Sequence, residues 1–445
     1  TKRLGVNISN PHINKKIKML QSKKFALGTT TVWSFKSRGN WATHNGNYRG
    51  NWSPYIPKNV ILRFSNESDT ILDCFCGAGT TGVECKLNNR NFIGVDINSK
   101  AIELAKENID FGNYESSLEK KPKIDFRISD ARDLSFINDE SIDLICTHPP
   151  YANIIHYTDN QKQDLSFCEP HKFLNEMHKV AKESYRVLKH NKHCAVLIGD
   201  MRKNKHVIPL GFWLIDIYLK NGFILKELVI KRQHNCKTTG FWYNNSIKYN
   251  FLLLAHEYLV IFQKTNKETN NNNFKYTQKL LLQDINLDNN IRFENSSYFD
   301  TDKISIESTT AWVFNKNTWI NKTLSNLIKR YSSKEYYLYN IHTNKQKDLD
   351  LIIYFYNTDF DKCIEFSKNH LINDGILAII CKDFRLDNGL IIPNGIYIEQ
   401  KLRDICDFKI KELVVISIEN GEKIENNQDL DITHKYILIY RRDRK

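Results

Sequence analysis

The chain of 445 residues lacks the marks of several protein classes. No apolar run approaches the roughly 18 residues that a membrane-spanning helix needs, and residues 1–10 have no apolar core typical of a secretion signal. The ten cysteines form no C-x-x-C pair, and Cys74 and Cys76 are too close together for a usual zinc site. We therefore expect no membrane and no metal partner, and the scattered cysteines are typical of reduced thiols in a cytoplasmic protein.

Acidic residues are absent from residues 1–60, which contain eleven Lys or Arg, while the whole chain has a formal net charge of +13. Such a local positive field favours a polyanion as partner, although a basic arm that only aids solubility has the same composition. Aromatic side chains that can pack on bases are interleaved with these charges, namely Trp33, Phe35, Trp41, Tyr48 and Trp52. The combination favours nucleic acid, with Lys36, Arg38 and Arg49 as expected contacts.

Apolar periodicity divides the chain into a basic segment at 1–68, an α/β unit at 69–264, an Asn-rich linker at 265–275 and a second α/β region at 276–445. Short apolar runs predict strands at Thr70–Asp73, Asn91–Asp96, Ile124–Ile128, Ile142–Thr147, Cys194–Gly199, Ile224–Lys231 and Tyr258–Gln263. Amphipathic windows predict helices at Thr81–Leu87, Ser99–Phe111, Pro170–Leu188 and Leu210–Asn221. This alternation is typical of a Rossmann-like parallel sheet with helices on both faces.

The second α/β region repeats segments of the first in the same order. The pairs include CAVLIGDMR at 194–202 with LAIICKDFR at 377–385, and HEYLVIF at 256–262 with HKYILIY at 434–440. Trp33 and Asp143 are 110 positions apart, whereas Trp312 and Asp350 are only 38 apart, so the second copy lacks about 72 residues. We expect a truncated, degenerate copy that binds no cofactor, with an unrelated DNA-recognition domain as the alternative.

A glycine-rich turn follows the first predicted strand in the sequence DCFCGAGTTG. The strand ends at Asp73, Gly77 and Gly79 let the backbone pass close to a ligand, and a helix begins at Thr80–Thr81. The second strand ends at Asp96, whose carboxylate can accept hydrogen bonds from ribose hydroxyls. These features predict a nucleotide-like ligand at the carboxyl edge of the sheet.

A third strand leads to Asp130, whose carboxylate is placed to accept a hydrogen bond from the amine of an adenine ring in such a ligand. The glycines alone do not identify the ligand, because Gly77, Gly79 and Gly82 also satisfy the G-x-G-x-x-G spacing of dinucleotide-binding proteins.

The motif that separates these alternatives is THPPY at residues 147–151, at the end of the fourth strand. Two successive prolines fix the backbone, and Tyr151 places an aromatic ring beside the Pro149 carbonyl. Such a corner suits a planar ring that carries an exocyclic amine, because the ring can stack while the amine donates to the carbonyl. A proline-terminated strand with a tyrosine in the core is the plainer interpretation of these residues alone.

Together the motifs resemble the DNA amino-methyltransferases, which use S-adenosylmethionine to modify N6 of adenine or N4 of cytosine. DCFCGAGTTG resembles their D-x-F-x-G-x-G-T-T cofactor motif, THPPY resembles their [D/N/S]-P-P-[Y/F] motif, and residues 51–61 resemble the segment that packs on the methionine end of the cofactor. The resemblance covers about residues 30–264. It implies a class I methyltransferase fold with cofactor contacts from Asp73, Phe75, Gly77, Gly79, Thr80, Thr81, Asp96, Ile97, Asp130 and Ala131.

The resemblance also implies catalytic roles for Thr147, His148, Pro149, Pro150 and Tyr151. His148 departs from the family, which has Asp, Asn or Ser at that position. A neutral imidazole can accept one amine proton while the Pro149 carbonyl accepts the other. The motif therefore leaves cytosine and adenine open, and an inactive DNA-binding homologue is a further alternative.

Double-stranded DNA is the implied substrate, and a cognate restriction endonuclease is a further partner to consider. The target base must flip out of the duplex, and the acid-free segment 231–250 is expected to assist. Its candidate DNA contacts are Lys231, Arg232, Lys237, Trp242 and Tyr243. An RNA methyltransferase of the guanine-N2 type is the main alternative, because such enzymes carry similar N-P-P-Y motifs.

Overall fold

The computed structural model describes most of the chain. The described residues are 19–22, 25–111, 121–152, 157–158, 163–234, 237–265, 306–333, 335–339, 348–356, 359–419 and 429–443. Within them, no helix is both long and apolar enough to cross a membrane.

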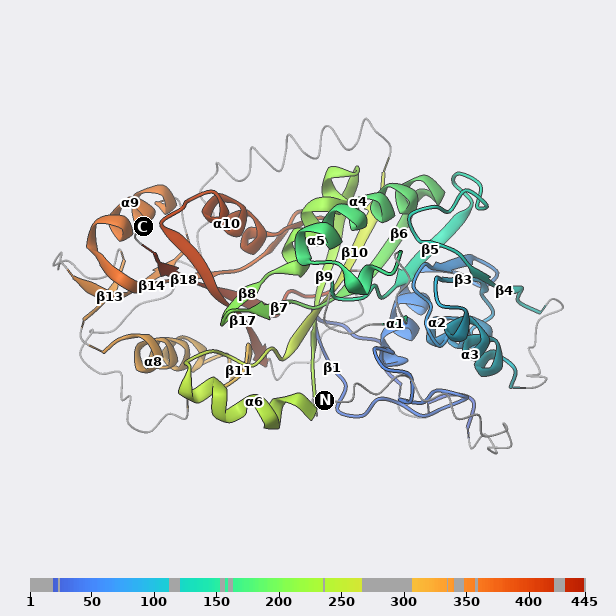
Figure 1. The fold of residues 1–445 in the computed structure, drawn as a ribbon, viewed down its shortest axis with the longest axis horizontal. Helices are drawn as coiled ribbons and strands as arrows, with labels where there is room; N and C mark the ends of the chain where they lie inside the picture. The colour runs from blue at the N-terminus through green and yellow to red at the C-terminus, as the bar shows by residue number, and fades with distance from the viewer. Residues whose placement is uncertain are drawn as a thin grey trace.

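The first half of the chain contains an eight-stranded sheet with the order β1-β9-β10-β6-β5-β2-β3-β4 (Figure 1). The strands are β1 (Val32–Ser34), β2 (Thr70–Asp73), β3 (Asn91–Asp96), β4 (Ile124–Ile128), β5 (Ile142–Thr147), β6 (Leu188–Ile198), β9 (Phe223–Arg232) and β10 (His256–Lys264). All neighbouring pairs are parallel except those that β10 makes with β6 and β9. The strand order reverses between β2 and β5, which is where ligands bind in open α/β sheets.

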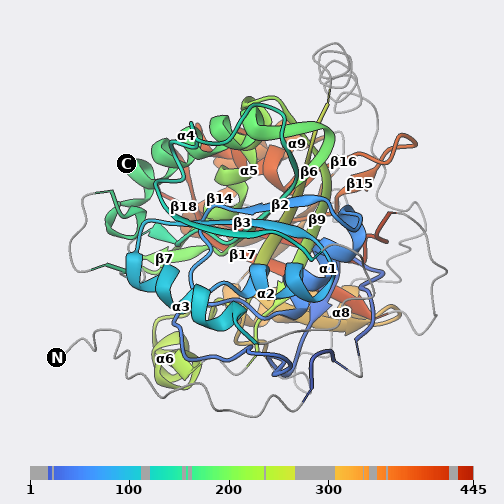
Figure 2. The ribbon, with the colours of Figure 1, turned by 90° about the vertical axis from the view of Figure 1, so that its right-hand side faces the viewer.

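Helices cover both faces of this sheet, as Figure 2 shows from the side. One face carries α1 (Tyr55–Phe64), α2 (Thr80–Leu87) and α3 (Ser99–Ile109), and the other carries α4 (Pro170–Val187) and α5 (Leu210–Lys220). Successive residues of β5 alternate between the faces: Leu144 and Cys146 pack with the α1 side, and Ile145 with the α4 side. The predicted Rossmann-like α/β class is therefore confirmed.

Residues 25–68, which are part of the basic segment at 1–68, pack with this unit. Strand β1 pairs with β9, and α1 packs against the sheet. Trp33 and Trp52 are buried between α1 and the sheet, and Trp41 is buried against Val83 and Leu87 of α2, so all three contribute to the hydrophobic core. The basic residues at 1–18 and 23–24 lie outside the described residues.

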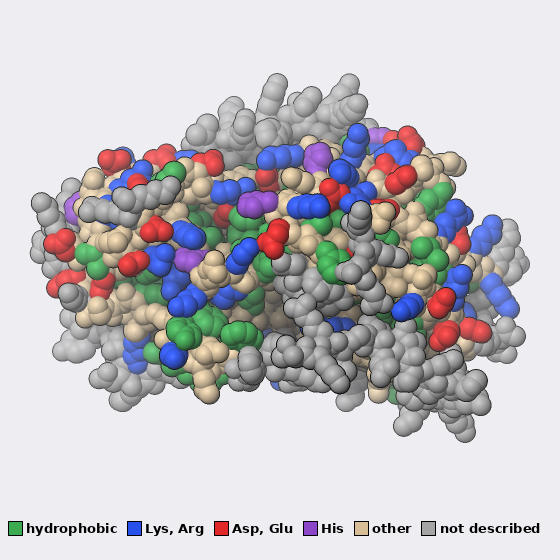
Figure 3. Space-filling model, viewed as in Figure 1, with side chains coloured by type: hydrophobic (Ala, Val, Ile, Leu, Met, Phe, Trp, Pro, Cys, Tyr) green, Lys and Arg blue, Asp and Glu red, His purple; other side chains and the backbone are tan. Residues whose placement is uncertain are grey.

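A helix, α6 (Lys237–Lys248), follows β9 within the acid-free segment 231–250 that is expected to assist base flipping. Its exposed side chains include Trp242, Tyr243 and Ile247, which are 47%, 46% and 62% accessible. Hydrophobic side chains gather over this helix on the face seen in Figure 3. An exposed apolar group of this kind is typical of a surface that meets a partner.

The second half has a six-stranded sheet with the order β11-β17-β18-β14-β13-β12. Its strands are β11 (Ala311–Asn315), β12 (Tyr336–Leu338), β13 (Leu349–Phe355), β14 (Leu371–Cys381), β17 (Phe408–Glu419) and β18 (His434–Arg442), with helices α8 (Trp319–Tyr331), α9 (Phe360–His370) and α10 (Asn394–Arg403). This order matches that of the first sheet without the counterparts of β3 and β4, and β18 is likewise antiparallel to both neighbours. The topology therefore supports a truncated duplication.

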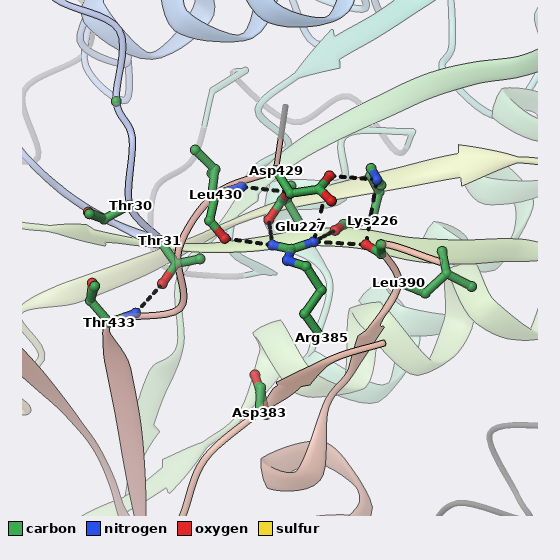
Figure 4. A network of polar contacts seen from close by, with 12 residues as sticks. Thr30, Thr31, Lys226, Glu227, Asp383, Arg385, Leu390, Asp429, Leu430 and Thr433 are labelled. Carbon is green, nitrogen blue, oxygen red and sulfur yellow. Dashed lines mark hydrogen bonds and ion pairs between the residues drawn. The ribbon is translucent and has the colours of Figure 1, made fainter. Parts of the chain in front are cut away.

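Each half extends a short hairpin toward the other, β7 (Met201–Lys203) with β8 (His206–Ile208) and β15 (Phe384–Arg385) with β16 (Ile391–Ile392). Arg202 of the first hairpin pairs with Glu412 of the second half at 2.5 Å, and Arg385 of the second hairpin pairs with Glu227 of the first half at 2.6 Å. Figure 4 shows Arg385 also donating to the Leu430 carbonyl, while the Leu430 N–H donates to Glu227.

The contacts at the ends of β10 and β18 are reciprocal in the same way. His256 of the first half lies 2.9 Å from the Thr310 hydroxyl of the second, and His434 of the second half lies 2.7 Å from that of Thr31. The hydrophobic core on the α4 and α5 face continues from one half into the other. The two halves are therefore packed like the subunits of a symmetric dimer.

Candidate active site

The glycine turn between β2 and α2 is held by the acid at the end of β3. The Asp96 Oδ2 accepts a hydrogen bond of 2.9 Å from the Gly77 N–H. Gly77 has a φ of 49°, and a Cβ there would lie 3.1 Å from the Tyr48 ring. Only glycine suits this combination of a left-handed backbone and a close aromatic neighbour.

Asp73 connects this turn to the diproline corner, which is formed by residues 147–151. Its carboxylate accepts from the Thr81 hydroxyl at 2.5 Å and from the Thr147 hydroxyl at 2.7 Å. Burial raises the pKa of Asp73 to about 6, although these hydrogen bonds act in the opposite direction. Asp73, Thr81 and Thr147 are all buried, so they fix the position of the two loops relative to each other.

A cleft of about 730 Å³, including its open mouth, lies at the carboxyl edge of the sheet beside the switch between β2 and β5. Predicted site residues that line it are Phe75, Gly77, Asp96, Ile97, Asp130, Ala131, His148 and Pro150. The cleft therefore brings the glycine turn and the diproline corner together in one space.

The remaining predicted site residues do not line this cleft. Gly79 packs against Ala105 of α3, and the Thr80 hydroxyl donates to Asn51 at 2.5 Å. Pro149 is buried, whereas Tyr151 is half-buried and adjoins the cleft through His148. Five residues of the two motifs instead support the loops around the cleft, because each is buried in contacts between loops or with the next helix. They are Asp73, Gly79, Thr80, Thr81 and Thr147.

The diproline corner is built around His148. Its ring stacks on Trp52 with centroids 5.5 Å apart, and its Nε2 lies 2.7 Å from the Tyr151 hydroxyl. The Tyr151 hydroxyl donates to Glu257 at 2.9 Å. Burial lowers the pKa of His148 to about 4, so the imidazole is neutral at physiological pH. A neutral ring at this position can accept a hydrogen bond from an amine.

Asn51 and Trp52, from the loop before α1, also line the cleft, and both belong to the segment 51–61 that was expected to pack on the cofactor. Tyr157 and Asp164, which follow the diproline corner, were not predicted, because no motif marked them. Glu257 was also missed, because its place beside Tyr151 depends on a strand more than 100 residues away.

Comparison with known proteins finds methyltransferases that resemble parts of this chain. The family model described as DNA methylase matches residues 6–107, and one described as a methyltransferase domain matches residues 65–228. The Type II methyltransferase M.HpaI from Haemophilus parainfluenzae is 31% identical over 132 residues, which are 29% of this chain and 42% of that protein. Over these segments the chain is similar to DNA methyltransferases.

Other relatives match shorter shares of their own length. The Type II methyltransferase M.BglI from Bacillus subtilis is 35% identical over 17% of this chain and 23% of its own length. The tRNA (guanine(10)-N2)-dimethyltransferase of Methanothermobacter thermautotrophicus is 34% identical over 29% of this chain and 35% of its own length. The chain therefore spans less than half the length of each of these relatives.

Among solved structures, a methyltransferase from Methanosarcina mazei aligns over 47% of this chain and 98% of its own, with 18% identity and a TM-score of 0.33. The cofactor of the family is S-adenosylmethionine, and the lining of the cleft fits it. Asp96 and Asp130 supply acceptors for hydroxyl and amine groups, Gly77 leaves its backbone accessible, and Phe75 and Ile97 supply apolar walls. No cluster of three or more potential metal ligands occurs among the described residues.

The residues expected to contact DNA lie in different settings. Lys36 and Arg49 are exposed and Arg232 is half-buried, whereas the side chain of Lys237 lies outside the described residues. Arg38 is a correction: its guanidinium donates to the Asn51 and Trp52 carbonyls at 2.7 Å, which fixes the loop of the cleft. Lys231 is a second correction, because its ammonium pairs with Glu257 at 2.6 Å. Both side chains are therefore engaged inside the protein.

Proposed function

We propose that this chain transfers the methyl group of S-adenosylmethionine to the exocyclic amine of a flipped base in DNA, at N4 of cytosine or N6 of adenine. The observation that carries the proposal is the shared cleft, in which Gly77 and Asp96 face the same space as His148 and Pro150. A glycine turn that suits the cofactor thus opens beside a corner that suits an amine.

Different residues of the cleft would bind the cofactor and the target amine. When bound, S-adenosylmethionine supplies an electrophilic methyl group on a sulfonium. Asp96 would hold the ribose hydroxyls, while His148, which lines the cleft, would accept a hydrogen bond from an amine proton. Transfer would form a bond between the amine nitrogen and the methyl carbon and break the S–CH₃ bond, so that the sulfonium becomes a thioether and the proton released by the amine passes to solvent. Acceptors placed on the amine stabilise the positive charge that develops on nitrogen.

DNA would reach this cleft across the surface that carries Lys36 and Arg49, both exposed. The exposed aromatic side chains Trp242 and Tyr243 of α6 supply faces on which unpaired bases can stack. The second half would then act as a scaffold or as a recognition surface, because its sheet lacks the counterparts of β3 and β4.

Methylation of RNA is a second candidate, favoured by the match to the tRNA (guanine(10)-N2)-dimethyltransferase. Mass analysis of nucleosides after incubation with duplex DNA or structured RNA distinguishes the candidates. We expect N4-methylcytosine or N6-methyladenine from DNA and no methylated guanosine from RNA. Methyl-guanosine from RNA without a DNA product would contradict the proposal, and no product from either would indicate an inactive homologue.

The cofactor site should depend on pH through Asp96, whose pKa burial raises to about 6 from its ordinary value of 3.8. As the pH falls through 6 the carboxyl group becomes protonated and loses acceptor capacity, so we expect cofactor affinity to weaken below that pH. Asp96→Asn should lower the affinity at pH 7.5 by roughly 10-fold or more and flatten the profile. Calorimetric titration between pH 5 and 8 measures both effects.

Asp125→Asn is the matched control, because this carboxylate on β4 is half exposed and pairs with Arg127. An unchanged slope around pH 6 in Asp96→Asn would assign the dependence to another group.

A further inference from the structure

Four side chains form a hydrogen-bonded chain behind the diproline corner. The Lys231 ammonium lies 2.6 Å from Glu257 Oε2, and Glu257 Oε1 accepts from the Tyr151 hydroxyl at 2.9 Å. The Tyr151 oxygen lies 2.7 Å from His148 Nε2. Lys231 on β9 and Glu257 on β10 are directly opposite in the antiparallel ladder, so the sheet itself fixes the start of this chain.

The donors and acceptors of this chain can be ordered in one way only. Burial alone would raise the pKa of Glu257, but the charge of Lys231 and the hydrogen bonds lower it overall, so Glu257 is a carboxylate that only accepts. Tyr151 has one proton, and it points to Glu257. The Tyr151 oxygen can then only accept from His148, which requires the proton of the neutral imidazole to be on Nε2.

The other ring nitrogen is left as an acceptor. His148 lines the cleft, and its Nδ1 has no hydrogen bond to any described residue. Stacking on Trp52, with an interplanar angle of 21°, holds the plane of the ring. The lone pair of Nδ1 is therefore available to a group inside the cleft.

We propose that Lys231, Glu257 and Tyr151 are positioning residues that hold His148 as the Nε2–H tautomer, with Nδ1 as the acceptor for the amine of the target base. This inference rests on the proposed function for the identity of the amine, while the tautomer itself follows from the four side chains. His148 thereby supplies the acceptor that Asp, Asn or Ser would supply at this position in the DNA amino-methyltransferases that the sequence resembles.

Comparison of the two halves shows which of these contacts are shared and which occur only in the first half. The contact of histidine with tyrosine and aspartate occurs in both halves, as His256–Tyr258–Asp200 and as His434–Tyr436–Asp383. The counterpart of Glu257 in the repeated segment is Lys435, and the residue opposite Lys435 is Ile416. The Lys–Glu pair is thus present in the half with the glycine turn and absent from the described residues of the other.

Glu257→Gln tests the assignment sharply, because Lys231 can only donate. The amide oxygen must face Lys231, its NH₂ group then donates to Tyr151, and the Tyr151 proton turns to His148 Nε2. We expect ¹⁵N NMR of histidine-labelled full-length protein to show Nε2–H for His148 in the wild type and Nδ1–H in Glu257→Gln. The signal of His148 is identified by its loss in His148→Asn.

The same variant should lower kcat by roughly 100-fold, while cofactor affinity stays within a few-fold of the wild-type value. Glu365→Gln, an exposed residue of α9, is the control and should change neither tautomer nor kcat. Nδ1–H in the wild type, retention of Nε2–H in Glu257→Gln, or an unchanged kcat after the switch would each overturn the inference. If the wild type makes no methylated nucleoside, the proposed function fails, while the NMR result still decides the tautomer.

Discussion

His148→Ala should lower kcat for methyl transfer by about 10²- to 10³-fold, because it removes an acceptor that stabilises charge in the transition state. Cofactor affinity should stay within a few-fold, since the glycine turn and Asp96 are held by Asp73 and β3 rather than by His148. Single-turnover measurement with radiolabelled cofactor separates the two effects.

His148→Asn should retain more activity than His148→Ala, because an amide oxygen can also accept from the amine. His178→Ala on α4 is the matched control, since His178 is exposed and far along the chain from the corner. Wild-type turnover in His148→Ala would show that His148 takes no part in the reaction.

Arg202→Met should lower the free energy of unfolding by about 3–5 kcal/mol, because it leaves a buried carboxylate without its partner. The Glu412 side chain has no accessible surface, and Arg202 also donates to the Leu252 carbonyl at 2.8 Å. Arg385→Met should have a similar effect through Glu227, since the two pairs are reciprocal. Urea denaturation followed by circular dichroism measures both.

The double variant Arg202→Met/Glu412→Met should recover most of the lost stability, because two apolar side chains can replace a buried ion pair at little cost. Arg127→Met is the control, since its pair with Asp125 is half exposed and such pairs contribute at most about 1 kcal/mol. A loss of less than about 1 kcal/mol in Arg202→Met would show that the hairpin contact does not hold the two halves together.

The central strands could be predicted because they are buried on both faces. The runs at Thr70–Asp73, Asn91–Asp96 and Ile142–Thr147 have the predicted bounds, since an apolar run between polar loops has one interpretation in a parallel sheet. Ile124–Ile128 also has the predicted bounds, although it is an edge strand whose residues are partly or fully exposed. Strand β1 was missed because it has only three residues and pairs with β9, about 200 positions away. The local sequence therefore does not indicate that β1 pairs with β9.

The motifs located the site but did not give every residue its role. The cofactor motif implied contacts from Asp73 and Thr81, yet their side chains bond to each other, because the turn must be fixed before it can hold a ligand. Charge patterning implied DNA contacts from Arg38 and Lys231, although one binds backbone carbonyls and the other a carboxylate. The hydrogen-bonding partners of such side chains depend on the strand register and on the path of the loops, which composition does not specify.

The reciprocal packing of the two halves has a consequence for how the protein responds to dilution. Both contact surfaces belong to one polypeptide, so each half meets the other at an effective concentration set by the connecting segment rather than by the amount of protein in the cell. Obligate homodimers lose their partners as their concentration falls. A fused pair keeps the same association at any abundance, which suits a protein present in few copies.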